Sequence, residues 1–270
     1  MMKYFLIFFT LTQFAWGDSL ILKVFSPPKP IDWSSPGYFM SSVIWGRLSF
    51  EKYPMGHTFV EISCQGERTY LSQVMKNNDS LKQFLFAGSG LGILFHSFEG
   101  ELKLGEEVLK EQKGRDLTSL EVKINPQQCL RLLTYVNDYR KHDIGQHYGP
   151  ALRPLFGEGA SSTNFAASFL EVLNIMDADL KIAWSTTVNV PLELSGPPLR
   201  DEGVNILKVY ITADEWASEN EPHRKLRFYD PQKIAAWIKA QKKPVLDKSY
   251  LPAPKGAVFL QHTDPNYRKK

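Results

Sequence analysis

The chain has 270 residues, of which 43% are hydrophobic and 13% aromatic, enough apolar material for a packed core. Its 32 basic and 29 acidic side chains leave a net charge of only +3. This near balance argues against a nucleic-acid-binding protein, because such proteins carry a clustered basic surface.

The N-terminus has the pattern of a secretory signal. Lys3 precedes an apolar run over residues 4–9, and Ala15-Trp16-Gly17 places small residues at both ends of a cleavage motif. We therefore expect a signal peptide over residues 1–17, cleavage between Gly17 and Asp18, and export to the periplasm or secretion. After cleavage no apolar segment reaches the ~20 residues that a transmembrane helix needs, so no membrane span is expected in the mature chain.

The hydrophobic pattern then predicts a mixture of strands and helices in chain order. Strands are expected at 20–25, 56–64, 69–74, 93–95, 117–124 and 204–211, helices at 81–85, from 126, from 162 to 174 and at 231–241, and either element at 38–48. In the helix from residue 126, Cys129, Leu130, Leu133 and Val136 form one apolar stripe. We predict an α+β protein, with a core over 18–175 and a C-terminal extension over 176–270 packed on the same domain.

A histidine occupies the start of the second predicted strand, Gly56-His57-Thr58-Phe59-Val60-Glu61-Ile62. Because side chains alternate along a strand, His57 and Glu61 share one face and Cys64 lies on the other. Cys64 is therefore a poor candidate for a nucleophile beside His57. In an oxidising compartment the two cysteines, Cys64 and Cys129, permit one disulfide, and the sequence decides neither for nor against it.

The sequence predicts neither a metal site nor a cofactor. Two cysteines are too few for a cysteine-ligated zinc or an iron–sulfur cluster. His142 and His147 are five residues apart at a helix end, which puts their rings on different faces, and no HExxH-like pattern accompanies them.

A glycine-rich turn, Gly157-Glu158-Gly159, delivers Ser161-Ser162-Thr163 to the start of a predicted helix. Backbone N–H groups at a helix N-terminus favour developing negative charge, so a hydroxyl there is well placed for nucleophilic catalysis. Serine and threonine are also the preferred helix caps, so these residues are equally consistent with capping alone.

The two segments, a histidine strand followed by a helix that begins with the nucleophile, resemble the circularly permuted branch of the papain-like superfamily. That branch includes NlpC-type cell-wall amidohydrolases and lecithin:retinol acyltransferase-like proteins; Tyr148-Gly149 and Arg153-Pro154 add to the resemblance, which ends near residue 175. It implies an antiparallel sheet with the nucleophile-bearing helix packed on it, no cofactor, and cell-envelope peptides or lipid-linked acyl groups as substrates.

By this resemblance His57 matches the catalytic histidine and Ser162 matches the nucleophile, where the family usually has cysteine. Glu61 is the orienting acid that strand alternation suggests, and Ser161 or Thr163 are alternative registers for the nucleophile. Serine needs a better-placed base than cysteine, because it does not rest as an anion. Two functions stay open: a serine-variant amidase, esterase or acyltransferase of the cell envelope, and a non-catalytic binding or structural protein that retains the scaffold. The oligomeric state is not predicted.

Overall fold

The computed structural model describes residues 17–48, 53, 55–76, 88–212 and 214–259. The predicted signal peptide, apart from Gly17, lies outside these residues, as does the helix predicted at 81–85. Within them the protein is α+β, as the sequence predicts.

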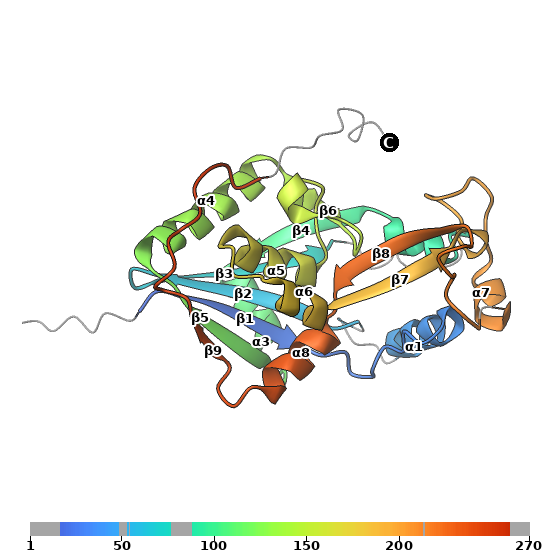
Figure 1. Cartoon of the computed structure of the whole chain (residues 1–270), viewed down its shortest axis with the longest axis horizontal. Helices are drawn as coiled ribbons and strands as arrows, with labels where there is room; N and C mark the ends of the chain where they lie inside the picture. The colour runs from blue at the N-terminus through green and yellow to red at the C-terminus, as the bar shows by residue number, and fades with distance from the viewer. Residues whose placement is uncertain (1–16, 49–52, 54, 77–87, 213, 260–270) are drawn as a thin grey trace, which may run out of the picture.

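A seven-stranded sheet in the order β6-β4-β3-β2-β1-β5-β9 forms the centre of the molecule (Figure 1). Its strands are β1 (Ser19–Phe25), β2 (His57–Cys64), β3 (Glu67–Met75), β4 (Phe98–Leu104), β5 (Thr118–Lys123), β6 (His147–Tyr148) and β9 (Val245–Asp247). All neighbours are antiparallel except β5 and β9, which run parallel. A separate two-stranded sheet pairs β7 (Ser185–Pro191) with β8 (His223–Tyr229).

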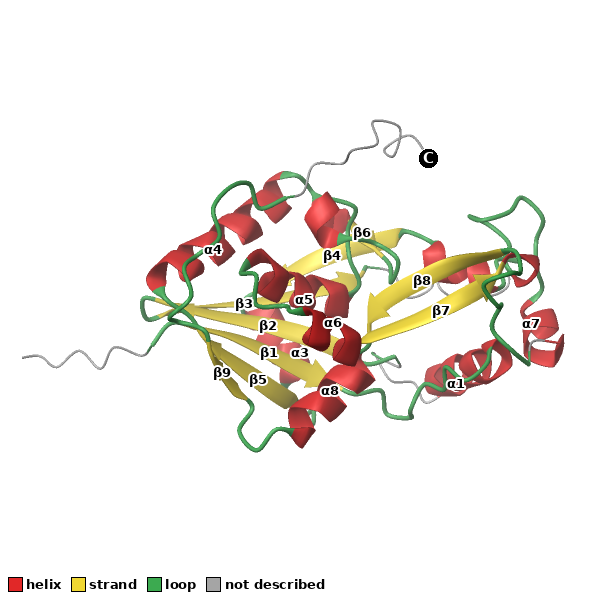
Figure 2. Cartoon of the chain, in the orientation of Figure 1, coloured by secondary structure: helices red, strands yellow, loops and turns green. Residues whose placement is uncertain are grey.

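Helices cover both faces of the main sheet (Figure 2). The α-helices are α1 (Pro36–Leu48), α3 (Glu106–Gln112), α4 (Pro126–Lys141), α5 (Ser162–Val172), α6 (Ala178–Trp184), α7 (Ile206–Thr212) and α8 (Pro231–Ala240). Short 3₁₀ turns are η1 (Leu91–Phe95), η2 (Ile144–Gln146), η3 (Pro154–Phe156) and η4 (Leu192–Leu194). α4, α5 and α8 lie on one face and α3 on the other, while α1, α7 and the β7–β8 sheet form one end of the molecule.

Strand alternation sorts the residues of β2 between two apolar clusters. Val60 and Ile62 pack with Phe165 and Phe169 of α5 in the largest cluster. Phe59, which precedes Val60 in sequence, packs instead with Val108 of α3. Every residue of β2 is buried, which is expected for a central strand covered by helices on both faces.

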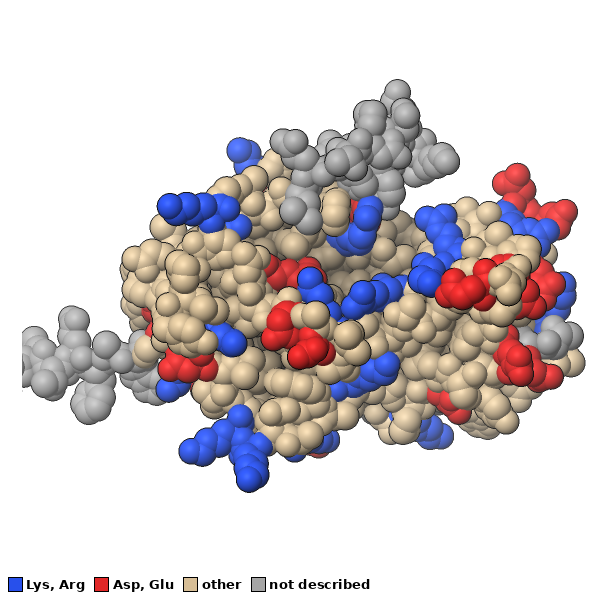
Figure 3. Space-filling view, viewed as in Figure 1, with Lys and Arg blue, Asp and Glu red and all other residues tan. Residues whose placement is uncertain are grey.

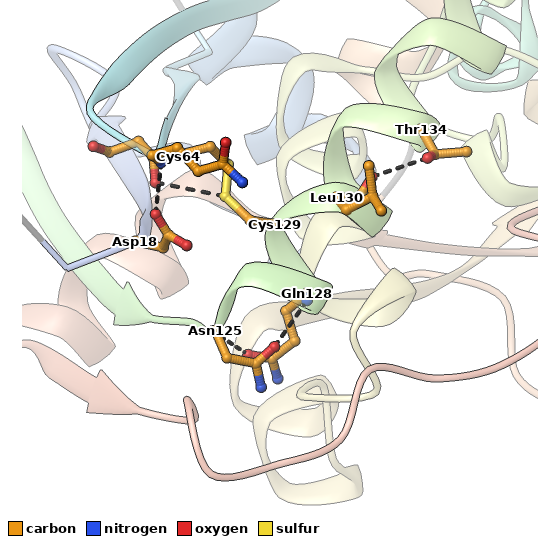
Figure 4. The surroundings of a disulfide bond; sticks show 9 residues. Asp18, Cys64, Asn125, Gln128, Cys129, Leu130 and Thr134 are labelled. Atoms are coloured by element: carbon orange, nitrogen blue, oxygen red, sulfur yellow. Dashed lines mark hydrogen bonds between the residues drawn. A yellow bond between two sulfur atoms is a disulfide. The ribbon is translucent and has the colours of Figure 1, made fainter.

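The disulfide left open by the sequence is present between Cys64 and Cys129, with 5.9 Å between the Cα atoms (Figure 4). It joins the end of β2 to the first turns of α4. Cys64 therefore points away from His57, and this prediction from strand alternation is confirmed. Asn125 begins α4 with a capping box, in which its side chain accepts from the Gln128 N–H and its own N–H donates to the Gln128 side chain.

The stripe predicted on α4 is partly wrong. Leu130 is 67% exposed, and Leu132, Tyr135 and Tyr139 join Cys129 and Val136 in the buried stripe. The two tyrosines account for the shift, because their large rings follow the helical period and pack on Phe169 and Phe165 of α5.

Two strand predictions are also wrong. Residues 206–211 of the strand predicted at 204–211 lie in the helix α7, because the Asn205 side chain accepts from the Leu207 N–H and caps the first turn. Val204 forms only an isolated bridge with Ser89. Only part of the apolar pattern of α7 is buried: Val209 is 0% exposed, whereas Leu207 and Ile211 are 60% and 65% exposed. Residues 93–95 lie in the 3₁₀ turn η1, and the undecided 38–48 segment is the helix α1.

Residues after 175 contribute directly to the main sheet and its core. Leu246 of β9 pairs with Val122 of β5, and Ile234 and Ile238 of α8 lie in the same cluster as β1 and β2. The predicted start of α8 is confirmed: Asp230 accepts from the Gln232 N–H, and Pro231 is the first helical residue. On the face seen in Figure 3, basic and acidic side chains are interspersed.

Candidate functional site

A cavity of about 350 Å³ lies where the ends of the central strands meet α1, β8 and the first turn of α5. Its walls are mainly aromatic and aliphatic. Residues that form these walls include Trp33, Phe39, Met40, Leu94, Phe98 and Phe228. A concave, mostly apolar space with a few polar groups at one end is the usual form of a small-molecule site.

Aromatic stacking fixes the wall formed by α1 and the segment before it. The rings of Trp33 and Phe39 stack with 4.3 Å between centroids, and Phe228 lies 5.0 Å from Trp33. The Trp33 carbonyl accepts a hydrogen bond of 2.7 Å from the Trp216 indole N–H. Because each ring is held by the next, this wall is preformed.

The polar end of the cavity is the start of α5. Ser161 is the helix cap, and its hydroxyl accepts from the Asn164 N–H at 3.2 Å. The Asn164 amide donates to the Pro150 carbonyl at 2.8 Å and accepts from the Tyr229 N–H at 3.0 Å. These bonds fix the first turn, so that Ser162 and Thr163, 2% and 4% exposed, line the cavity at defined positions.

Tyr148 is the side chain that meets Ser162 in this cavity. Burial raises the pKa of Tyr148 above the usual value, and hydrogen bonding with the side chain and backbone of Ser162 lowers it by a smaller amount. Tyr148 is therefore protonated at neutral pH. It is a hydrogen-bonding partner for Ser162 and not a base that could take its proton.

The charged residues of the described part of the chain that reach this cavity are Lys76, Glu101 and Lys103. Lys76 pairs with Glu99, and Lys103 donates to Glu111 at 3.0 Å. Their carboxylate partners raise the pKa of both lysines, so both stay charged, and each charge is matched by an acid outside the cavity.

His57 is fully buried on the α3 side of the sheet. Its Nε2 lies 2.7 Å from the Ser72 hydroxyl, and the Tyr53 ring stacks on the imidazole at 4.0 Å. The Tyr53 hydroxyl donates to Glu111, and this bond together with burial raises the pKa of Tyr53. A neutral aromatic ring therefore covers His57.

The structure does not bring His57 and Ser162 together, because they lie on opposite faces of the sheet. His57 shares its face of β2 with Phe59, which packs with α3, whereas α5 packs on Val60 and Ile62. Figure 1 shows α5 in front of the strands and α3 behind them. At this level of β2 the residue on the α5 face is Thr58.

Glu61 is also separated from His57. Its carboxylate is 3% exposed and pairs with Lys23 at 2.7 Å and Arg68 at 3.4 Å, both from neighbouring strands. Four residues along a strand is ~13 Å, so these cations, and not the imidazole, are its partners. Lys23 in turn donates to Gln112 of α3 at 3.2 Å.

Two further polar residues noted in the sequence, Glu158 and His147, lie in or next to the loop before α5. The Glu158 carboxylate accepts from the Arg153 backbone N–H at 3.0 Å and from its guanidinium, which fixes the turn. His147 is exposed, with Nδ1 at 3.4 Å from the Ser97 hydroxyl. Among the residues that the structure describes, no group of three or more His, Cys, Asp and Glu side chains could hold a metal ion.

Sequence reasoning missed Tyr148 and the aromatic wall. The wall has a sequence signal, because Trp33, Phe39 and Met40 crowd around a proline- and glycine-containing turn. The contact between Tyr148 and Ser162 has none, since it depends on how β6 and α5 meet in the fold.

No helix in the described part of the chain is long and apolar enough to cross a membrane. No family model, curated protein or solved structure matches this chain.

Proposed function

We propose that this chain is a non-catalytic binding protein that holds a small, largely apolar molecule in the cavity between α1, β8 and the start of α5. The observation that carries the proposal is the pairing of Ser162 with Tyr148, a protonated phenol, at the end of an apolar cavity. The preformed aromatic wall supports it, because a rigid site loses little conformational entropy on binding.

Serine hydrolysis makes different demands on this site. Serine attacks only when a base removes its proton during the reaction, and in known triads that base is held by an acid. Here the neighbour of Ser162 is Tyr148, while His57 and Glu61 have partners elsewhere. The serine-variant amidase, esterase or acyltransferase predicted from the sequence is therefore the competing function.

We further propose that the scaffold derives from the permuted papain-like branch and that the protein is exported. The order of β2 before α5, with α5 packed on antiparallel strands, supports the first point. The Cys64–Cys129 disulfide supports the second, because disulfides persist mainly in oxidising compartments such as the periplasm. Cell-envelope peptides or lipids are then the available ligands, as the resemblance implies.

Binding is tested with the chain from Asp18 onward and an apolar fluorescent probe. We expect the probe to bind, and Val43→Trp, which enlarges a side chain of the cavity wall, to weaken binding by about tenfold or more. Ile182→Trp is the matched control, because Ile182 is 71% exposed and away from the cavity. Failure of the folded protein to bind, or equal binding by Val43→Trp, contradicts the proposal.

The competing function is tested on the same preparation with peptidoglycan fragments and simple esters. Turnover that disappears in Ser162→Ala establishes a serine hydrolase and overturns the non-catalytic proposal. Turnover that appears only in Ser162→Cys identifies an inactive relative of a thiol hydrolase. That outcome supports the proposal of a non-catalytic binding protein that retains this scaffold.

A further inference from the structure

We infer that the molecule held in this cavity is uncharged: an apolar body with one terminal hydroxyl or carbonyl group that hydrogen-bonds to Tyr148 and Ser162. This inference rests on the binding function proposed above and names the chemical class of its ligand. It follows from three properties of the cavity: its hydroxyl-lined end, its matched charges and its size.

Among the residues that the structure describes, the polar end carries hydroxyl groups and no unmatched charge. Tyr148, Ser161, Ser162 and Thr163 line it together. A hydroxyl both donates and accepts, so a cluster of hydroxyls serves a neutral hydroxyl or carbonyl ligand. Tyr148 is neutral because burial dominates its pKa.

Within the described ranges of the chain, an anionic group finds no unmatched cation there. A helix start offers free backbone N–H groups to anions, but two of those in α5 already have partners. The Asn164 N–H donates to the Ser161 hydroxyl, and the Ser162 backbone bonds to Tyr148. Lys76 and Lys103, the cations of the lining, are paired with Glu99 and Glu111. A buried carboxylate or phosphate would lose its hydration without a matching charge, which is strongly unfavourable.

A cationic group is excluded from the hydroxyl end by the same reasoning. Glu101 is the carboxylate of the lining, and it lies in β4 beside Lys103, whose pKa its charge helps to raise. Glu101 is also exposed, so water and the neighbouring lysines already stabilise its charge. An ammonium placed beside Tyr148 and Ser162 would therefore be buried without a carboxylate from the part of the chain that the structure describes.

The volume of the cavity narrows the chemical class of the ligand further. A volume of about 350 Å³ is at the small end of ligand cavities, which run from about 300 to 1,000 Å³. Such a space fits a single chain or a few fused rings and is too small for a lipid with two acyl chains. We therefore infer a single-chain or compact ring compound with one neutral polar end.

The test compares four polar compounds of equal chain length, and the alkane of the same length, at about pH 8, where a carboxylic acid and an amine are both ionised. A primary alcohol, a methyl ester, a carboxylate and an alkylammonium each compete with the fluorescent probe. We expect the alcohol and the ester each to bind with an affinity at least about tenfold higher than that of either ion. Tyr148→Phe and Ser162→Ala should each weaken alcohol binding by about five- to tenfold while leaving binding of the matching alkane unchanged.

Tyr250→Phe is the matched control for the tyrosine change, because Tyr250 is 73% exposed. If the carboxylate or the ammonium binds as tightly as the alcohol, the inference of an uncharged ligand is wrong and the binding function stands. If Tyr148→Phe weakens alcohol and alkane binding equally, the hydrogen-bonding role of Tyr148 is wrong. If the probe itself does not bind to the folded protein, the binding function fails and the inference fails with it.

Discussion

Breaking the Cys64–Cys129 disulfide should remove a large part of the free energy of unfolding. The two cysteines are 65 residues apart in sequence, so the bond closes a long loop in the unfolded chain. In the chain-entropy account, a loop of this length contributes about 14 to 15 cal/mol/K, or about 4 kcal/mol at room temperature. A typical domain has only about 5–15 kcal/mol in total, so the reduced protein should be close to its stability limit.

The assay is urea unfolding of the oxidised protein and of the same protein in reductant, followed by circular dichroism. Reduction keeps both sulfur atoms in the core, where Cys64 is 7% and Cys129 2% exposed, so the difference isolates the covalent link. The Cys64→Ala, Cys129→Ala double variant should lose at least as much, because it also leaves space between β2 and α4. Reductant should not change the double variant, which controls for other effects of the reagent.

A reduced protein within about 1 kcal/mol of the oxidised protein would refute this reasoning. It would mean that the unfolded chain already holds the ends of β2 and α4 together, or that the two cysteines are not bonded in the folded protein. Mass spectrometry after thiol alkylation of the oxidised sample distinguishes these outcomes, since a bonded pair takes up no label.

Two further predictions concern the packing and the pH dependence of stability. Gly92→Ala should lower the stability measured in thermal unfolding by about 1–3 kcal/mol, because the added Cβ would lie 2.6 Å from the Pro197 carbonyl oxygen. Gly203→Ala is the control and should be close to neutral, because its Cβ would lie 3.6 Å from the nearest atom. Burial raises the pKa of Tyr135, so the unfolded chain releases this proton first. Above about pH 10, Tyr135 alone should therefore lower the free energy of unfolding by about 1.4 kcal/mol per pH unit, in addition to the contributions of the other tyrosines whose pKa is raised. Tyr135→Phe should reduce that slope in denaturation experiments across this pH range and Tyr250→Phe should not; an unchanged slope in Tyr135→Phe would contradict the assignment.

Local features of the fold were predictable where a short-range rule acts alone. Strand alternation placed Cys64 opposite His57, and the Asp230-Pro231 pair marked the start of α8; both are confirmed. The same rules failed for α7, where one side-chain cap from Asn205 outweighs a run of β-branched residues.

The candidate site was less predictable because it depends on which face of a strand each helix covers. Alternation correctly grouped His57 with Phe59, but nothing in the sequence states that α3 covers that face and α5 the other. The pairing of His57 with Ser72, and of Ser162 with Tyr148, joins segments whose approach is set only by tertiary packing.

The parallel pairing of β5 with β9 has a consequence for folding during synthesis on the ribosome. Glu121 aligns with Val245, so β5 pairs with a strand that is synthesised more than a hundred residues later. Until that segment leaves the ribosome, β5 offers unpaired N–H and C=O groups to any extended chain nearby. Pairings between distant segments also form slowly, so a chaperone that shields this edge would have most effect before β9 can pair with β5.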